Sequence, residues 1–193
     1  MDLDALRAGF DGRLLGLTGA PGVGKSTLAA RLASAWGAVV VPMDGFHIAD
    51  VELARRGLLD RKGAPETFDA EGYAALLARV RGREPLVMAP SFERDLEQPI
   101  AGALPVPGSA PVVVTEGNYL LLDEPRWQAV RAQLDAVWHL RVDPALRRSR
   151  LVDRHVAFGK SPDEAEAWVR AVDDPNAALV EAAAERTDLV IDL

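Results

Sequence analysis

The sequence lacks cysteine, long apolar runs and an excess of positive charge. Without cysteine it can form no disulfide, thiolate metal site or thiol nucleophile. No run approaches the roughly 20 apolar residues of a membrane-spanning helix, and the first residues show no basic and apolar signal segment. We therefore expect a cytoplasmic protein with no membrane partner. The net charge of −7 argues against nucleic acid as a main partner, because proteins that bind nucleic acid usually carry a basic excess.

Lysine and histidine are also scarce. Only three of the 22 basic residues are lysines, at positions 25, 62 and 160, so arginine is available wherever any cation suffices. Lys25 needs the compact ammonium group that a tight loop requires. Lys62 and Lys160 are retained for a similar reason or are ordinary surface residues, and the sequence leaves both interpretations open. The histidines at 47, 139 and 155 lack zinc-ligand spacing, so we predict no structural metal.

A complete phosphate-binding loop follows the first apolar run. The motif G-x-x-x-x-G-K-[ST] begins at Gly19, after the strand-like run 14–17, and leads into a helical pattern of Leu28, Leu32 and Trp36. This strand, loop and helix order is the context in which backbone N–H groups and a lysine hold phosphates. A simple glycine turn would not explain the Lys-Ser-Thr that follows. We predict that a nucleoside triphosphate binds to Gly19, Ala20, Gly22, Val23, Gly24, Lys25, Ser26 and Thr27.

Apolar runs alternate with amphipathic segments along the chain, which predicts an α/β fold. The expected strands are 13–18, 38–43, 86–89, 111–116, 137–142 and 187–192. Asp69, Asp143 and Ser161 are placed as helix N-caps, and the last begins a capping box. We predict one P-loop domain over 1–193, a three-layer sandwich around a mostly parallel five-stranded sheet.

Two stretches interrupt the alternation. The first excursion, 44–68, is rich in charge and glycine. The second, 90–110, is rich in proline and forms either a loop or a short hairpin. Because long loops in a compact α/β domain are usually functional, we expect both to build the acceptor site.

Acidic residues follow two predicted strands, at the sheet edge where ligands bind in open parallel sheets. Glu116 follows strand 111–116, in the position of a magnesium ligand beside Ser26. Asp44 follows strand 38–43 and is suited to act as a base that orients or deprotonates an attacking hydroxyl. The alternatives are a capping role for Glu116 and an Asx-turn role for Asp44.

Arginines form a stripe on the helix that begins at Pro144. Arg147, Arg150 and Arg154 fall on one helical face. We interpret the region of about 144–172 as a lid in which Arg150 and Arg154 stabilise charge on the transferred phosphate. The alternative is a solvated face that pairs with acidic residues elsewhere.

Several segments together resemble the type I pantothenate kinases and their relatives in the phosphoribulokinase and uridine kinase group of P-loop kinases. They include 44–46, 56–58, 61–69, 89–94, 116–121, 150–155 and 174–176, and the chain is similar to a short, less characterised nucleoside or sugar kinase-like branch. The resemblance implies ATP and Mg²⁺, a small hydroxyl acceptor, a base at Asp44, a lid arginine at Arg154 and, as an expectation, a homodimer.

The acceptor site is expected around the two excursions. His47, Lys62 and Arg94 are candidates from their positions, and the signature segments add Phe46 and Phe68. The resemblance places Tyr119 and Asn176 at or near the acceptor. Pantothenate kinases carry a histidine where this chain has Phe92-Glu93-Arg94, which argues against pantothenate.

The sequence thus predicts an ATP-dependent kinase that transfers the γ-phosphate to a hydroxyl of a nucleoside, sugar or pantothenate-like metabolite. One alternative is a nucleotide-dependent switch or accessory protein without a small acceptor. Its GTPase version is disfavoured because no Asn-Lys-x-Asp motif occurs. The other alternative is a degenerate nucleotide binder without catalysis.

Overall fold

Five parallel strands form the central sheet of the computed structural model, which describes residues 1–193. The strands run in the order β2-β5-β1-β6-β7. Their bounds are Leu14–Thr18 for β1, Val39–Pro42 for β2, Val113–Glu116 for β5, Ala136–Arg141 for β6 and Leu189–Asp192 for β7. The predicted α/β sandwich with a five-stranded parallel sheet is confirmed, and each of these strands lies within a residue or two of its predicted range.

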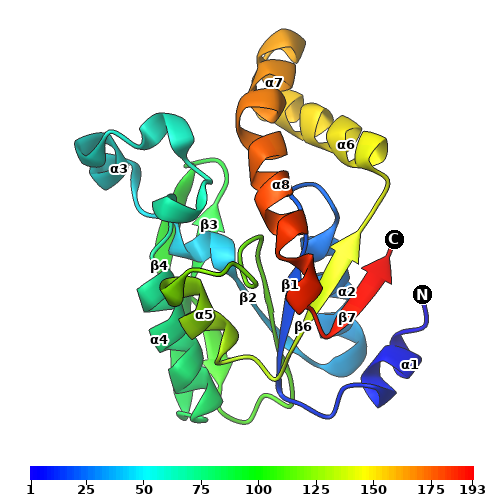
Figure 1. The fold of residues 1–193 in the computed structure, drawn as a ribbon. Helices are drawn as coiled ribbons and strands as arrows, with labels where there is room; N and C mark the ends of the chain where they lie inside the picture. The colour runs from blue at the N-terminus through cyan, green and yellow to red at the C-terminus, as the bar shows by residue number, and fades with distance from the viewer.

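Helices cover both faces of the sheet (Figure 1). One face packs against α1 (Leu3–Ala8) and α2 (Lys25–Trp36), and the other against α4 (Ala70–Arg81), α5 (Pro125–Arg131) and α8 (Asp174–Ala182). Successive strand residues point to opposite faces. Leu14 therefore joins the larger core cluster, whereas Leu15 and Leu17 join the smaller one. With both faces covered, the strands read as continuous apolar runs.

A separate antiparallel hairpin lies beside the central sheet. Its strands are β3 (Leu86–Glu93) and β4 (Gln98–Pro107). The predicted strand 86–89 is the first part of β3, so it belongs to this hairpin and not to the central sheet. The second excursion is therefore the hairpin rather than the loop. Pro99, Pro105 and Pro107 cannot donate backbone hydrogen bonds, which suits β4 to an edge position.

The first excursion is a chain of short helical turns. It contains η1 (Met43–Phe46), α3 (Asp50–Arg56), η2 (Leu59–Arg61) and η3 (Pro65–Thr67). A bridge between His47 and Phe68 joins the two ends of the segment. The excursion is thus anchored at the end of β2 and returns to the start of α4.

Beyond β6 the chain forms a helical arm. It comprises α6 (Pro144–Ala157), α7 (Pro162–Trp168) and the π-helix η4 (Val169–Asp173), and it leads into α8; the short turn η5 (Ala184–Arg186) precedes β7. Asp143 and Ser161 cap α6 and α7 as predicted, and Ser161 forms the capping box with Glu164. The arm and α3 rise from the same end of the sheet (Figure 1). No helix has the length and apolar character needed to cross a bilayer.

Gly45 couples the fold to the site, because it packs directly against the hairpin. A Cβ at this position would lie 2.5 Å from the backbone oxygen of Pro90. We expect Gly45→Ala to lower the free energy of unfolding by about 1–3 kcal/mol, the usual cost of overpacking, and to displace the adjacent Asp44. Chemical denaturation measures the loss. The control is Gly82→Ala, where the nearest atom is 3.4 Å away; equal stability of the two variants would contradict the close packing at Gly45.

Candidate active site

A cleft of about 880 Å³ opens at the carboxyl edge of the sheet. The P-loop, the two excursions and the helical arm all contribute to its lining. These segments meet because β1, β2, β5 and β6 are parallel, so the loops that leave them lie at one edge. Its volume lies towards the upper end of the usual range for small-molecule sites.

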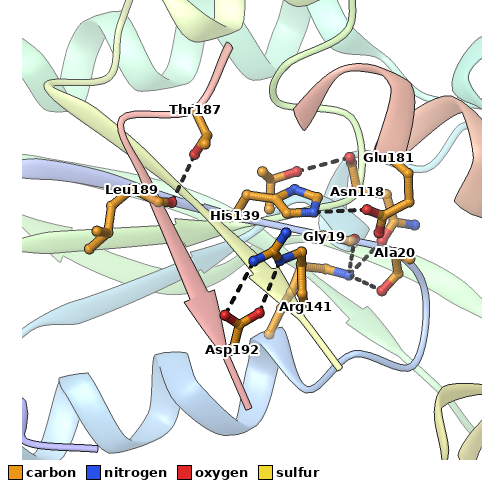
Figure 2. Close-up of polar contacts among 11 residues, drawn as sticks. Gly19, Ala20, Asn118, His139, Arg141, Glu181, Thr187, Leu189 and Asp192 are labelled. Carbon is orange, nitrogen blue, oxygen red and sulfur yellow. Dashed lines mark hydrogen bonds and ion pairs between the residues drawn. The ribbon is translucent and has the colours of Figure 1, made fainter. Parts of the chain in front are cut away.

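The P-loop turns tightly between β1 and α2. Gly22 and Gly24 have φ angles of 81° and 108°, which residues with a Cβ rarely adopt. Lys25 Nζ donates to the backbone oxygens of Gly19 and Ala20, at 2.8 and 3.2 Å, and to Asn118 Oδ1 at 2.6 Å. Figure 2 shows Gly19, Ala20 and Asn118 gathered at this point. The loop therefore holds the lysine against its own backbone.

Burial changes the ionisation of Lys25. The pKa of its ammonium group is lowered to about 8, chiefly because burial disfavours the charge, while the nearby carboxylates of Glu116 and Asp44 oppose the change. A phosphate placed in the loop adds negative charge beside the ammonium and raises its pKa again. Binding of a nucleotide and protonation of Lys25 are therefore linked.

This linkage predicts proton uptake on ATP binding. At pH 9 most of Lys25 is neutral in the free protein, so binding should take up about one proton and ATP affinity should fall as pH rises above about 8. At pH 7 the ammonium is already charged, and Lys25 should contribute little uptake. Calorimetry in two buffers of different ionisation enthalpy measures the proton count. Arg170→Ala, at an exposed position of the arm that does not line the cleft, should leave it unchanged, and equal uptake at both pH values would contradict the linkage.

Ser26 and Glu116 form the other polar pair of the loop. Ser26 Oγ donates to Glu116 Oε1 over 2.9 Å, and Glu116 is paired with Leu17 of β1 and Pro42 of β2 in the sheet register. Burial, and then the carboxylate of Asp44, raise the pKa of Glu116. A hydroxyl and carboxylates are oxygen ligands of the kind that Mg²⁺ prefers. The structure has no cluster of three or more acidic or histidine side chains that could hold a metal ion by itself.

Asp44 lies at the end of β2, as its sequence position predicts. Its carboxylate is 34% exposed and accepts from Arg94 at 3.1 Å. His47 Nδ1 lies 2.8 Å from the backbone oxygen of Asp44, and burial lowers the pKa of this imidazole. His47 also stacks on Phe68 and Phe92, with ring centroids 4.1 and 4.7 Å apart. The hairpin and the first excursion thus meet around Asp44.

Not all the acceptor-site candidates reach the cleft. His47, Lys62, Phe68, Arg94 and Asn176 line it. Phe46 and Tyr119 do not, because both are buried behind the lining. The Tyr119 hydroxyl donates to the backbone oxygen of Gly63 over 2.5 Å, so it supports the wall.

The arginine stripe of α6 divides into two sets. Arg147 of the stripe and its neighbour Arg148 pair with Asp174 at 3.0 and 2.5 Å. Arg150 and Arg154 line the cleft and form no ion pair. Arg154 lies near enough to Lys25 that its charge lowers the lysine pKa. Two cations of the arm therefore line the cleft, and Arg154 is the one whose charge acts on the P-loop lysine.

Residues outside the predicted site also line the cleft. The side-chain oxygen of Asn118 accepts a hydrogen bond from Lys25. Its position two residues after Glu116, at the end of a predicted strand, could have identified it as a site residue. Asp173 is buried in the π-helix and binds His155 Nε2 over 2.8 Å. Asp50 binds Lys62 at 2.6 Å. No periodic or motif signal marks Asp50 or Asp173, because their partners are distant in sequence.

Comparisons with known proteins agree with this geometry. The crystal structure of a "putative fructose transport system kinase" from Silicibacter sp. TM1040 is similar to this chain, with a TM-score of 0.90 and 44% identity over 99% of both chains. "Putative uridine kinase C227.14" of Schizosaccharomyces pombe is 36% identical over 171 residues, 81% of this chain and 72% of that protein. A pantothenate kinase of Limosilactobacillus reuteri is 35% identical over 144 residues, 67% of this chain and 44% of that enzyme. No protein-family model matches the chain.

Proposed function

Because the chain belongs to the P-loop kinases related to uridine kinase and pantothenate kinase, we propose that it transfers the γ-phosphate of ATP to a hydroxyl of a small metabolite. The observation that carries the proposal is the placement of Asp44 at the same edge as the P-loop, lining one cleft with Lys25, Glu116 and Arg154. A P-loop by itself indicates only that the protein binds a nucleotide. A carboxylate beside it, with one oxygen not bound by Arg94, supplies the group that an attacking hydroxyl needs.

The donor half of the cleft is formed by the P-loop and the arm. Lys25 leaves the oxygens of Gly19 and Ala20 and binds the β- and γ-phosphates, while the N–H groups at the start of α2 hold further oxygens. Ser26 and Glu116 would hold Mg²⁺, which neutralises charge on the phosphates when bound. Arg150 and Arg154 stabilise the charge that develops on the transferred group.

Asp44 prepares the acceptor. Its Oδ1 accepts the hydroxyl proton or orients the hydroxyl for in-line attack, while Oδ2 stays bound to Arg94. The oxygen then forms the new bond to the γ-phosphorus as the bond to the β-phosphate oxygen breaks, which releases ADP. Closure of the arm, the proposed lid, excludes water, because water would otherwise compete with the acceptor.

Turnover with a panel of hydroxyl compounds tests the proposal. ATP consumption should be slow alone, and one panel class should increase it with formation of a phosphorylated product visible by mass spectrometry. Equal ADP release with and without every compound, stimulated only by a protein, would contradict a kinase and favour a nucleotide-dependent switch.

A further inference from the structure

The cleft has two halves that differ in the availability of their cations. In the donor half, Arg31, Arg150, Arg154 and Lys160 line the cleft and form no ion pair. In the acceptor half, the lining cations are Lys62 and Arg94, and each is already bound to a carboxylate. His47 is neutral near pH 7, because burial lowers its pKa from an ordinary value of 6.5. The acceptor half therefore offers no free positive charge.

Lys62 is the more firmly held of the two cations. Its side chain is 13% exposed, and Nζ lies 2.6 Å from Asp50 Oδ1. It also donates to the backbone oxygen of Glu97 and lies 5.4 Å from the ring centre of Phe92. The Arg94 guanidinium lies 5.8 Å from the same ring and binds Asp44. An anion that captured either cation would leave a carboxylate without its partner.

Hydrogen-bond acceptors predominate among the remaining groups of this half. The carboxylates of Asp44 and Asp50 line it. Asn176 is also buried at the wall, with Nδ2 3.5 Å from the oxygen of Gly63. Carboxylates accept hydrogen bonds and an amide both donates and accepts. Uncharged hydroxyls satisfy such a lining without changing its charge balance.

From this charge balance we propose that the acceptor is a neutral, polyhydroxylated molecule and neither a hydroxy acid nor an amino alcohol. The inference rests on the proposed kinase function and specifies its substrate class. A carboxylate on the acceptor would be repelled by Asp44 and Asp50, whose cations are already used. An ammonium group would lie beside Lys62 and Arg94 and compete with them for the same carboxylates. Free sugars, polyols and the ribose of nucleosides share the required hydroxyls.

Matched compounds that differ in one group provide the test. Glycerol, glycerate and 3-aminopropane-1,2-diol form one set. A hexose, its aldonic acid and its amino sugar form a second set. Ribonucleosides are tested as a third, neutral group, which distinguishes free sugars from nucleosides. Product formation from ATP is measured for each. We expect the neutral member to have a kcat/KM at least about tenfold above the charged members, since like charges brought together are costly.

Asp50→Asn provides an independent test, because it releases Lys62 without removing the cation. This variant should raise kcat/KM for the acid relative to the neutral compound by about tenfold. The control Glu52→Gln lies on the same helix, where Glu52 binds Arg55 and Arg56 outside the cleft, and it should leave the ratio unchanged.

The outcomes separate the two proposals. A wild-type preference for the acid or the amine, or an unchanged ratio in Asp50→Asn, overturns the inference on substrate class and leaves the kinase function intact. Failure of every compound, in a protein that still binds ATP with Mg²⁺, overturns the kinase function and this inference with it.

Discussion

Asp44→Asn is expected to lower kcat by about 10²–10⁴-fold, the usual contribution of a positioned base, while ATP affinity stays near the wild-type value. Asparagine keeps the shape of the side chain and can still accept one hydrogen bond from Arg94. It cannot take up the hydroxyl proton. Because Asp44 lies on the acceptor side of the P-loop, the loss should fall on kcat rather than on ATP binding. Steady-state kinetics and ATP titration measure the two quantities.

A matched control distinguishes the loss of a negative charge in this excursion from the loss of the proposed base. Asp60→Asn removes one carboxylate from the same excursion, in the exposed turn η2, and should leave kcat unchanged within a few-fold. If the Asp44→Asn variant kept the wild-type kcat, Asp44 would not be the catalytic base. Preserved ATP affinity together with preserved biological function in a protein without turnover would instead support a degenerate nucleotide binder.

Arg154→Ala is expected to lower kcat by about 10³–10⁵-fold, as the loss of an arginine that stabilises transferring phosphate does in related chemistry. Arg154 lines the cleft, forms no ion pair, and its charge is felt by Lys25. A side chain without a partner in the protein is available to a phosphate. Single-turnover measurements report the transfer step, and ATP affinity is expected to fall much less than the rate.

Arg170→Ala is the matched control for the arm. Arg170 lies in η4, is 70% exposed and is 3.9 Å from Glu166, so its loss should leave kcat within a few-fold of wild type. Arg154→Lys keeps the charge but not the planar fork, and it should recover only part of the rate. Equal rates for Arg154→Ala and Arg170→Ala would show that Arg154 takes no part in transfer.

Local sequence patterns were sufficient to predict the donor side. The glycine loop, the apolar strand before it and the helix after it are contiguous, so their relation is visible along the chain. Buried parallel strands also read as continuous apolar runs, which is why Val113 and Val114 were identified as part of the sheet. Asp44 and Glu116 could be placed at one edge because parallel strands end on the same side.

The acceptor side depends on contacts that the sequence does not display. Strand 86–89 has the same apolar character as a central strand, and only pairing with β4 shows that it belongs to the hairpin. Tyr119 was expected at or near the acceptor, and only tertiary packing shows that its side chain is buried and bound to the backbone oxygen of Gly63. Lys62 and Asp50 are 12 residues apart, and no local pattern indicates that they form an ion pair.

Acceptor-dependent stoichiometry tests the central claim most directly. The protein is incubated with ATP, Mg²⁺ and the acceptor that the panel identifies, and ADP and phosphorylated acceptor are quantified together by mass spectrometry. Phosphoryl transfer from the P-loop to a hydroxyl held at Asp44 predicts one phosphorylated acceptor for each ADP, and little ADP without the acceptor. ADP formed at the same rate in its absence, with free phosphate as the only other product, would contradict the account.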